Sequence, residues 1–294
     1  MQWGQIKTLF ILCFLVLDFF LVYQFINKTE QSQLGVLPDT SIEEQLEAED
    51  IQLQNVPENP PKKTYISAKR YDFKEEDLET LEENDNQNPE VYGNILISEF
   101  KEPVDIDLEA DESKISSIVK DEILFRDEYQ YWGYNERWNV LIFFQLREGD
   151  PIYYNQNGVV LAFLNEEKDG ISRFTQTHLD EIKNTGEEQD LIKPIQAIST
   201  LFDKNKLYSD DTVTKFDIGY YTLVQVPLQN GVQVFSPTWN IHVNEESNYF
   251  VNGLEGQYIS KDEDEFVNEF IQEMKDSVEK QQIELEQPIR GGES

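Results

Sequence analysis

The sequence predicts an α+β protein made of two tandem helix-plus-antiparallel-sheet units behind a single N-terminal transmembrane helix. An apolar run near the amino terminus is long enough to cross a bilayer. Strand-like alternation and amphipathic helices follow it, and their order repeats after roughly 76 to 82 residues. The predicted divisions are 1–28 for a short cytoplasmic tail and the anchor, 29–63 for an acidic proline-containing stalk, 64–170 for the first unit, 171–287 for the second unit with a C-terminal helix, and 288–294 for a tail.

The anchor is predicted from the run Thr8–Ile26, which spans roughly 28 Å as a helix at about 1.5 Å per residue. Trp3 and Lys7 precede the run and Lys28 follows it, at the depth where such side chains settle in headgroups. A cleaved signal peptide would end in a small-x-small motif, but the run continues as VYQFINKTEQS. We therefore expect an uncleaved anchor, with the amino terminus cytoplasmic and the bulk of the chain extracellular.

Asp18 lies near the middle of the run, where a carboxylate costs roughly 2.5 to 3.5 kcal/mol on insertion scales. One interpretation is that its helical stripe packs against a partner's transmembrane helix that supplies a hydrogen-bond donor. The other is that a protonated Asp18 is tolerated because its neighbours are so apolar. The predicted contact stripe consists of Ile11, Phe14, Leu15, Asp18, Leu21, Val22 and Phe25.

Composition excludes several classes of function. Against 24 Lys and Arg stand 58 Asp and Glu, a formal net charge of -34, which disfavours binding to nucleic acid and to anionic lipid surfaces. Hydrophobic residues make up 39 % of the chain, so the part outside the membrane can bury a core. The one cysteine lies in the anchor, which leaves no disulfide framework and no thiol metal site.

The stalk is polar and contains four prolines. Ser41 and Glu44 match a capping box, so a short helix over about 42–49 is expected within it. The stalk either extends away from the membrane or packs in part on the folded chain.

The first unit is expected to begin with a strand at TYISAKRYDF, followed by a helix over Glu75–Glu82 and a loop at NDNQNP. A strand at VYGNILISEF and a helix over Glu112–Phe125 come next. Three strands then follow in WNVLIFFQL, DPIYYNQNG and VVLAFLN.

The second unit is expected to open with a helix at QTHLDEIKNTG that Gly186 ends, and Thr185 and Glu188 would cap another helix reaching Lys206. Strands are expected in FDIGYYTLVQVPL, VQVFSPTW and NIHVN. The last predicted helix follows a Ser260 and Glu263 capping box, and its apolar stripe is Phe266, Val267, Phe270, Ile271, Met274 and Val278. Duplication explains the repeated order, and convergence of two ordinary α+β segments is the alternative.

Chemistry-bearing residues are few. His178, in a predicted helix, and His242, in a predicted strand, belong to no metal or triad signature, so no catalytic residue and no cofactor is expected. Alternating carboxylates at Asp105, Asp107, Glu109 and Asp111 are weak candidates for a metal site. A calcium loop would need glycine and glutamate where this sequence has Ala110 and Ser116, which favours a solvated strand end.

The aromatic segment YQYWGYNERW leaves two interpretations open. It is either the entry into a sheet core or an exposed binding patch. Because its Trp and Tyr directly precede a strand, the core interpretation is favoured.

The opening MQWGQIKTLFILCFLVLDFFLVYQFINK, the acidic stalk and the YISAKRYDF strand together resemble the YycI (WalI) family of low-GC Gram-positive bacteria. The resemblance implies a non-enzymatic, single-pass accessory protein of the WalK–WalR two-component system in cell-wall homeostasis. It also implies a hetero-oligomer with YycH (WalH), contact with the WalK histidine kinase through transmembrane helices, and an ectodomain of two α+β units similar to YycH. The contact role of Asp18 is inferred from the residues and is not a family property.

Two other functions compete with this one. A tethered extracellular binding module for a wall-associated cation or polypeptide would use the anchor only for attachment. A membrane-bound wall hydrolase is disfavoured by the absence of nucleophile, base and metal motifs from the sequence. Kinase inhibition and kinase activation are both compatible with the sequence.

Overall fold

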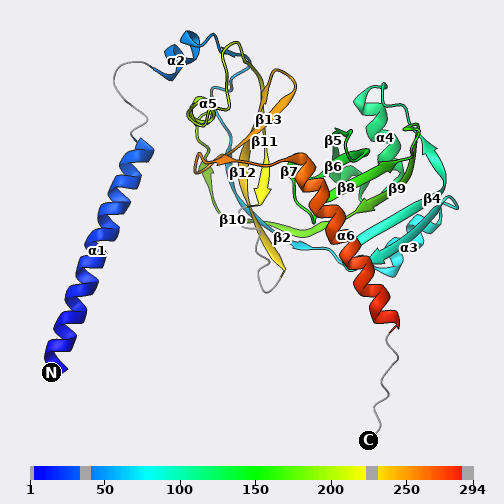
Figure 1. Ribbon diagram of the computed structural model, residues 1–294, viewed down its shortest axis with the longest axis horizontal. Helices are drawn as coiled ribbons and strands as arrows, with labels where there is room; N and C mark the ends of the chain where they lie inside the picture. Colours follow the sequence, from blue (N-terminus) through cyan, green and yellow to red (C-terminus); the bar gives the residue numbers. More distant parts are fainter. Residues whose placement is uncertain (1–2, 34–40, 223–230, 287–294) are drawn as a thin grey trace, which may run out of the picture. The chain divides into compact units, whose positions relative to one another are not determined.

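A computed structural model describes residues 3–33, 41–222 and 231–286 (Figure 1). The chain forms two compact units, Met1–Gln52 and Leu53–Ser294. Each unit is described by itself below.

The first unit contains α1 (Trp3–Gln33) and α2 (Ile42–Ala48). The predicted capping box begins α2: the Glu44 N–H donates to Ser41 Oγ at 3.2 Å, and the Ser41 N–H donates to the Glu44 carboxylate at 3.3 Å. Within the part of the chain that the structure describes, no helix combines the length and the apolarity that a membrane crossing requires. The transmembrane assignment therefore stays a prediction.

The second unit is built around one large, mainly antiparallel sheet, which confirms the α+β class. Its helices are α3 (Glu75–Glu82), α4 (Glu112–Glu122), the 3₁₀ turn η1 (Arg126–Glu128), α5 (Pro194–Asp203) and α6 (Glu263–Glu286). The strands of the chain are β1 (Gln52–Leu53), β2 (Lys62–Arg70), β3 (Gln87–Tyr92), β4 (Ile95–Asp105), β5 (Tyr129–Asn135), β6 (Val140–Arg147), β7 (Asp150–Tyr153), β8 (Val159–Leu164), β9 (Gly170–Gln176), β10 (Leu179–Asp190), β11 (Thr212–Thr222), β12 (Val232–Val243), β13 (Ser247–Asn252) and β14 (Tyr258–Ile259).

The strand order is β10-β2-β12-β11-β7-β6-β8-β9-β4-β3, with β5 beside β6, and β13 and β14 continuing from β12. The short strand β7 joins two groups of strands, since it is antiparallel to β6 and parallel to β11. Gly219 makes this junction possible: a Cβ there would collide with the Pro151 carbonyl oxygen and the Tyr153 ring. A side chain at Gly219 would force β7 and β11 apart.

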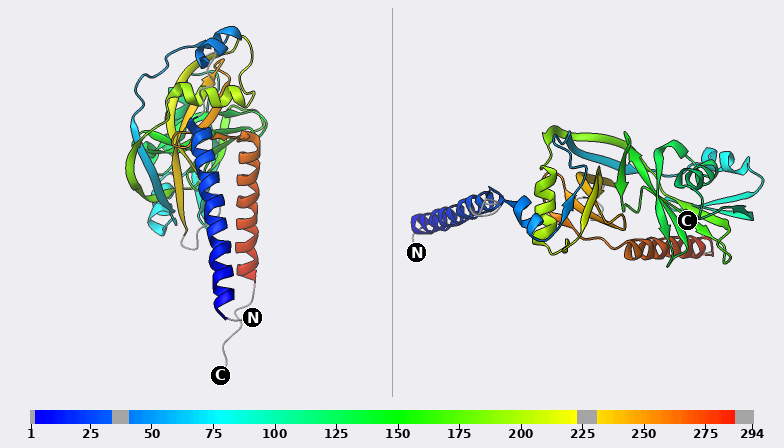
Figure 2. Two further views of the ribbon diagram at one scale, coloured as in Figure 1. Left: turned by 90° about the vertical axis from the view of Figure 1, so that its left-hand side faces the viewer. Right: turned by 90° about the horizontal axis from the view of Figure 1, so that it is seen from above.

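Helices cover both faces of the group that contains β6. Ile115 and Val119 of α4 pack in a core with Leu141 and Phe143, whereas α6 packs in another core with Val140, Ile142 and Phe144. The right-hand view of Figure 2, from above, shows α6 on one side of these strands and the teal helix α4 on the other. The apolar run in β6 is continuous because successive side chains point to opposite faces of the sheet, and a helix covers each face.

The predicted helix over 176–186 is wrong. Residues Leu179–Asp190 form β10, which pairs antiparallel with β2, with Leu179 opposite Arg70. The helix that follows is α5, and its first turn is closed by the Lys193 N–H donating to the Gln196 side chain at 2.9 Å instead of by Thr185. Helix-favouring residues are held as a strand here because the exposed sheet edge offers backbone partners.

Other boundaries also differ from the predictions. The two strands predicted across 232–244 are the single strand β12, and the predicted loop at NDNQNP already contains the start of β3. The Glu265 N–H donates to the Asp262 carboxylate at 3.0 Å, so Asp262 rather than Ser260 caps α6. Helix α4 ends at Glu122, and Phe125 has a left-handed backbone, φ 51°.

Strand pairing crosses the predicted limit between the two units. Strand β2, which lies in the predicted unit 64–170, pairs with β10 and β12 of the predicted unit 171–287. Strand β9, which begins at the limit between these predicted units, pairs with β4 and β8 of the unit 64–170. Each predicted unit therefore supplies a strand that pairs with strands on the other side of residue 170. The division into 64–170 and 171–287 stays a prediction.

Candidate functional site

The predicted contact stripe lies on α1. The side chains of Ile11, Phe14, Leu15, Leu21 and Val22 are exposed within their unit, and Asp18 is exposed among them. Phe25 belongs to α1, but its side chain lies outside the described residues. A single helix therefore carries the whole stripe.

The carboxylates of the acidic connection are not gathered around a common point. Asp105 ends β4, and the Asp107 carboxylate accepts the Glu109 N–H at 3.0 Å. Asp111 precedes α4 without a side-chain cap bond. Across residues 3–33, 41–222 and 231–286 there is no group of three or more His, Cys, Asp or Glu side chains that could hold a metal ion.

The first seven residues of the segment YQYWGYNERW form β5, and its aromatic side chains pack into the sheet cores, as the favoured interpretation expected. Tyr129 and Tyr131 belong to the core beneath α4, and the Trp132 ring contacts Phe144 and Tyr153 in the core beneath α6. The Trp132 Nε1–H donates to Glu263 Oε2 at 2.9 Å, so this indole ties β5 to the first turn of α6.

A pocket of about 520 Å³ lies where β10 begins, and sequence analysis missed it. Its walls come from the end of β2, the η1 turn, the β6–β7 turn and the bulged start of β10. The lining residues are Tyr71, Phe125, Glu128, Leu146, Arg147, Glu148, His178, Leu179, Asp180, Glu181 and Ile182. The incorrect prediction of a helix over 176–186 is the reason, because residues 178–182 lie beside β2 and β6 only when this segment is a strand.

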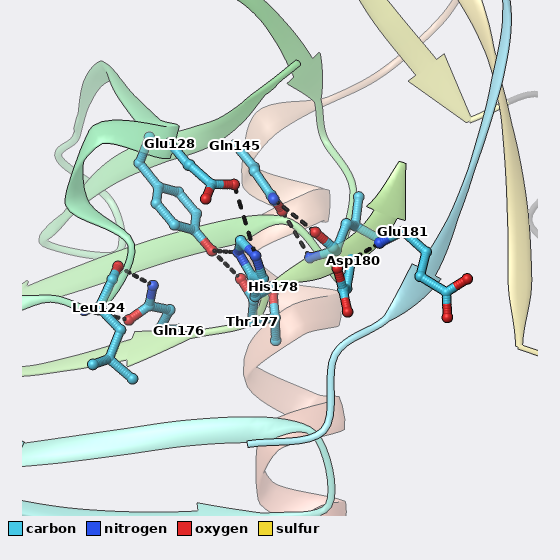
Figure 3. Close-up of polar contacts among 10 residues, drawn as sticks. Leu124, Glu128, Gln145, Gln176, Thr177, His178, Asp180 and Glu181 are labelled. Carbon is cyan, nitrogen blue, oxygen red and sulfur yellow. Dashed lines mark hydrogen bonds and ion pairs between the residues drawn. The ribbon is translucent and has the colours of Figure 1, made fainter. Parts of the chain in front are cut away.

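Two buried glutamines hold the backbone around this pocket (Figure 3). Gln145 accepts the Leu179 N–H at 2.8 Å and donates to the Leu179 carbonyl at 2.8 Å. Gln176 accepts the Leu124 N–H at 3.1 Å and donates to the Leu124 carbonyl at 2.7 Å. Each side-chain amide makes the donor and acceptor hydrogen bonds that a neighbouring strand would otherwise make. The backbone of Leu124 and Leu179 is thereby held in place where regular strand pairing ends.

His178 is buried at the inner wall of the pocket, with 5 % of its surface exposed. Its ring stacks on Phe125 with centroids 4.1 Å apart, and Tyr71 meets it edge-on. Nδ1 lies 3.1 Å from the Tyr129 hydroxyl, and Nε2 lies 3.8 Å from Glu128 Oε2. Burial lowers the pKa of His178 to about 4, so the imidazole is neutral near pH 7.

Carboxylates dominate the rim of the pocket. Arg147 is the one basic lining residue, and its Nη2 lies 2.8 Å from the Glu148 carboxylate. Hydrogen bonds from Lys183 and Lys69, each 2.8 Å long, lower the pKa of Glu181 to about 2. Glu128 and Asp180 form no ion pair with a lysine or arginine among the described residues.

The second histidine has a different setting. His242 Nε2 lies 2.8 Å from Asp217 Oδ2 on the neighbouring strand, and Lys215 Nζ lies 2.7 Å from the same oxygen. Burial alone would raise the pKa of Asp217, but the hydrogen bonds from His242 and Lys215 hold it below its ordinary value. The arrangement is a compact ion-pair network across β11 and β12.

Three solved structures match the chain at low similarity. An uncharacterized protein from Eubacterium rectale ATCC 33656 is 11% identical with a TM-score of 0.44, over 72% of this chain and 91% of that chain. The Bacillus megaterium YpeB C-terminal domain is 12% identical with a TM-score of 0.38, over 64% and 96%. YycH from Bacillus subtilis is 12% identical with a TM-score of 0.38, over 70% and 54%. Scores this low carry no conclusion about function.

None of the curated proteins compared with the chain matches it. The sequence profile described as "YycI protein" matches residues 30–254, which is more than half of the chain and begins after the end of the apolar run. This match is therefore independent of the anchor segment that first suggested the resemblance. The chain belongs to the YycI family, a family of membrane-associated regulatory accessory proteins of the WalK two-component system.

Proposed function

We propose that this chain is a single-pass membrane protein that modulates the WalK sensor histidine kinase through helix contacts in the bilayer, together with YycH. In this proposal α1 crosses the membrane with its amino terminus in the cytoplasm, and the folded unit is extracellular. Family membership supports the regulatory role. The observation that carries the contact is a stripe of exposed apolar side chains that surrounds one acid on a single helix.

The apolar surface of α1 supports an anchor. Large apolar side chains from Phe10 to Tyr23 are roughly half exposed or more, on every side of the helix. The described part of the first unit provides no core for them. In lipid these side chains would be in a favourable medium, whereas in water they would form an apolar patch larger than monomeric proteins expose.

Asp18 supports a partner rather than simple attachment. An anchor that only tethers gains from leucine at this position, because a carboxylate in the middle of the hydrocarbon is costly. A donor on a neighbouring helix would offset that cost and would favour one rotational setting of the two helices. Such a contact biases the kinase only if it differs in free energy between two signalling arrangements of the kinase helices.

The test is site-specific crosslinking in native membranes. Photo-reactive residues at positions 14, 18, 21 and 25 should capture WalK. Positions 16 and 20 are the matched controls, because helical spacing places them on the face opposite Asp18. Equal capture of WalK from both faces, or none from the Asp18 face, contradicts the proposal.

Exchanging the anchor separates this function from that of a tethered binding module. Residues 1–28 would be replaced by an unrelated single transmembrane helix without an acid. Loss of kinase control, measured as WalK autophosphorylation in membranes, is expected. Retained control would place the activity in the folded unit instead.

A further inference from the structure

The pocket beside His178 belongs to the folded unit, and nothing in the proposed contact through α1 uses it. Its volume of about 520 Å³ falls within the range of about 300 to 1,000 Å³ that is typical of small-molecule sites. Its occupant can be inferred from the hydrogen-bond directions around the histidine.

The tautomer of His178 follows from Tyr129. The Tyr129 hydroxyl lies 2.6 Å from the Thr177 carbonyl oxygen, which can only accept, so the single hydroxyl proton points there. The hydroxyl oxygen is then an acceptor toward Nδ1, 3.1 Å away. Nδ1 therefore carries the proton of the neutral ring, and Nε2 presents a lone pair.

That lone pair faces another acceptor. Nε2 points toward Glu128 Oε2 at 3.8 Å, and both residues line the pocket (Figure 3). Two acceptors at this separation form no hydrogen bond with each other. Among the described residues no donor is recorded for Nε2, although His178 is more than nine-tenths buried. The pair lacks a donor that can bond to both atoms at once.

An ammonium nitrogen fits this gap. Placed about 2.9 Å from each atom, it can bridge acceptors 3.8 Å apart and still direct a third proton to another carboxylate. Asp180 lines the same pocket and forms no ion pair with a lysine or arginine among the described residues. Leu146, Leu179 and Ile182 provide an apolar wall for an alkyl chain, and Phe125 lines the same pocket.

A divalent metal ion fits less well. Histidine and carboxylate would be suitable ligands, but a protein site needs at least a third. No such group of three occurs within the described ranges.

We propose that this pocket binds the primary ammonium group of an aliphatic amine, with His178 Nε2 and Glu128 as acceptors and Asp180 as counter-charge. The amine is either a free small molecule or the side chain of a lysine, since both present the same group on an alkyl chain. Occupancy would link the η1 turn to the start of β10.

The first experiment titrates n-butylammonium into the full chain in detergent micelles, with ¹⁵N NMR of the histidine rings. Saturable binding is expected, with the largest shift at His178 Nε2 and little change at His242. Two probes act as controls: n-butanol lacks the charge, and butyltrimethylammonium keeps the charge but has no N–H donor. Each should bind about tenfold more weakly or worse. Equal binding of either control, or a proton found on Nε2 in the free protein, overturns the proposal.

The second experiment compares Glu128→Gln with Asp127→Asn. Both residues are exposed and both substitutions remove one negative charge from the η1 turn, but only Glu128 lines the pocket. Glu128→Gln should weaken n-butylammonium binding about tenfold or more, and Asp127→Asn by about twofold or less. Similar losses of affinity in the two variants would mean that the amine responds only to the overall negative charge, and would overturn the proposal. Zn²⁺ that displaces the amine in the wild-type chain would overturn it in favour of a metal.

The third experiment identifies the source of the amine. Nα-acetyl-lysine methylamide carries the butylammonium group on a peptide backbone. Tighter binding than n-butylammonium supports a lysine side chain, and weaker binding supports a free amine. Failure of all three amine experiments would leave crosslinking through α1 unaffected, so this inference and the proposed function fail separately.

Discussion

The helices α1 (Trp3–Gln33) and α6 (Glu263–Glu286) are both long and both carry large apolar side chains, yet these side chains meet different surroundings. In α6, Phe266, Val267 and Phe270 are buried against the sheet, and the opposite face is acidic. In α1 the apolar residues continue around the helix and are exposed within their unit. The width of the apolar surface thus decides how a helix can bury it. A narrow stripe is covered by one face of a sheet, whereas an apolar surface that continues around the helix needs an apolar medium or a partner.

The largest effect expected from this contrast is in core packing. Phe270→Ala should lower the free energy of unfolding by about 3 to 5 kcal/mol, because it removes a fully buried ring. Phe14→Ala, which truncates a ring that is 55% exposed, should leave the unfolding of the folded unit unchanged. Urea denaturation followed by intrinsic tryptophan fluorescence measures both. Equal effects of the two substitutions would break the contrast between the helices.

The next effect concerns the polar contacts that fasten the start of α6. Glu263→Ala leaves the Trp132 Nε1–H and the Asn135 amide, each 2.9 Å from the Glu263 carboxylate, without this partner. The expected loss is about 1 to 3 kcal/mol of unfolding free energy. Glu265→Ala is the matched control, because Glu265 lies in the same first turn and is exposed. A control that loses as much would mean that these contacts stabilise nothing.

On the α1 side, a sharper test is Asp18→Leu. If Asp18 meets a donor on a partner helix, its loss should reduce crosslinking to WalK by about three- to thirtyfold, as expected for one interhelical polar contact. Asp18→Asn keeps an acceptor and should retain most of the yield. Undiminished capture with leucine would show that Asp18 is only tolerated in an apolar helix.

The smallest effect is the dependence of α6 on acid. A hydrogen bond from Asn135 and the nearby Arg137 guanidinium lower the pKa of Asp264 below its ordinary value of 3.8. The unfolded chain therefore binds this proton at a higher pH than the folded chain does. The contribution of Asp264 is complete above pH 3.8 and is lost as the pH falls through the folded-state pKa.

Because Asp264 is partly exposed, we expect less than about 1 kcal/mol from it. Comparing wild type with Asp264→Asn in urea titrations from pH 6 down to acid should show the difference between them shrinking. A difference that grows on acidification would contradict the assignment.

Some elements could be predicted because their pattern is local. The helix α3 was predicted at Glu75–Glu82 and is found there, and the Ser41 capping box needed only the spacing of two side chains. The α6 stripe was predicted correctly from Phe266 to Met274, since amphipathic spacing is a property of the helix itself.

The errors occur where a distant segment supplies the partners. Residues 179–190 favour a helix by composition, but β2 lies alongside and offers hydrogen bonds along its edge. The pocket was missed for the same reason, because His178 and Glu128 are fifty residues apart in sequence and meet only when β10 is a strand. A short sequence motif cannot predict a contact between residues that are so far apart in the chain.

The sequence by itself determined the helices whose stabilising contacts lie within a few residues, and it indicated the apolar run, the acidic charge and the family to which the chain belongs. Only the tertiary structure decided which strands share the sheet, that β2 joins β10 and β12, and that a neutral histidine faces a carboxylate across a pocket. The physical reason is range: helix hydrogen bonds and caps join near neighbours, whereas strand pairing and burial depend on residues far along the chain.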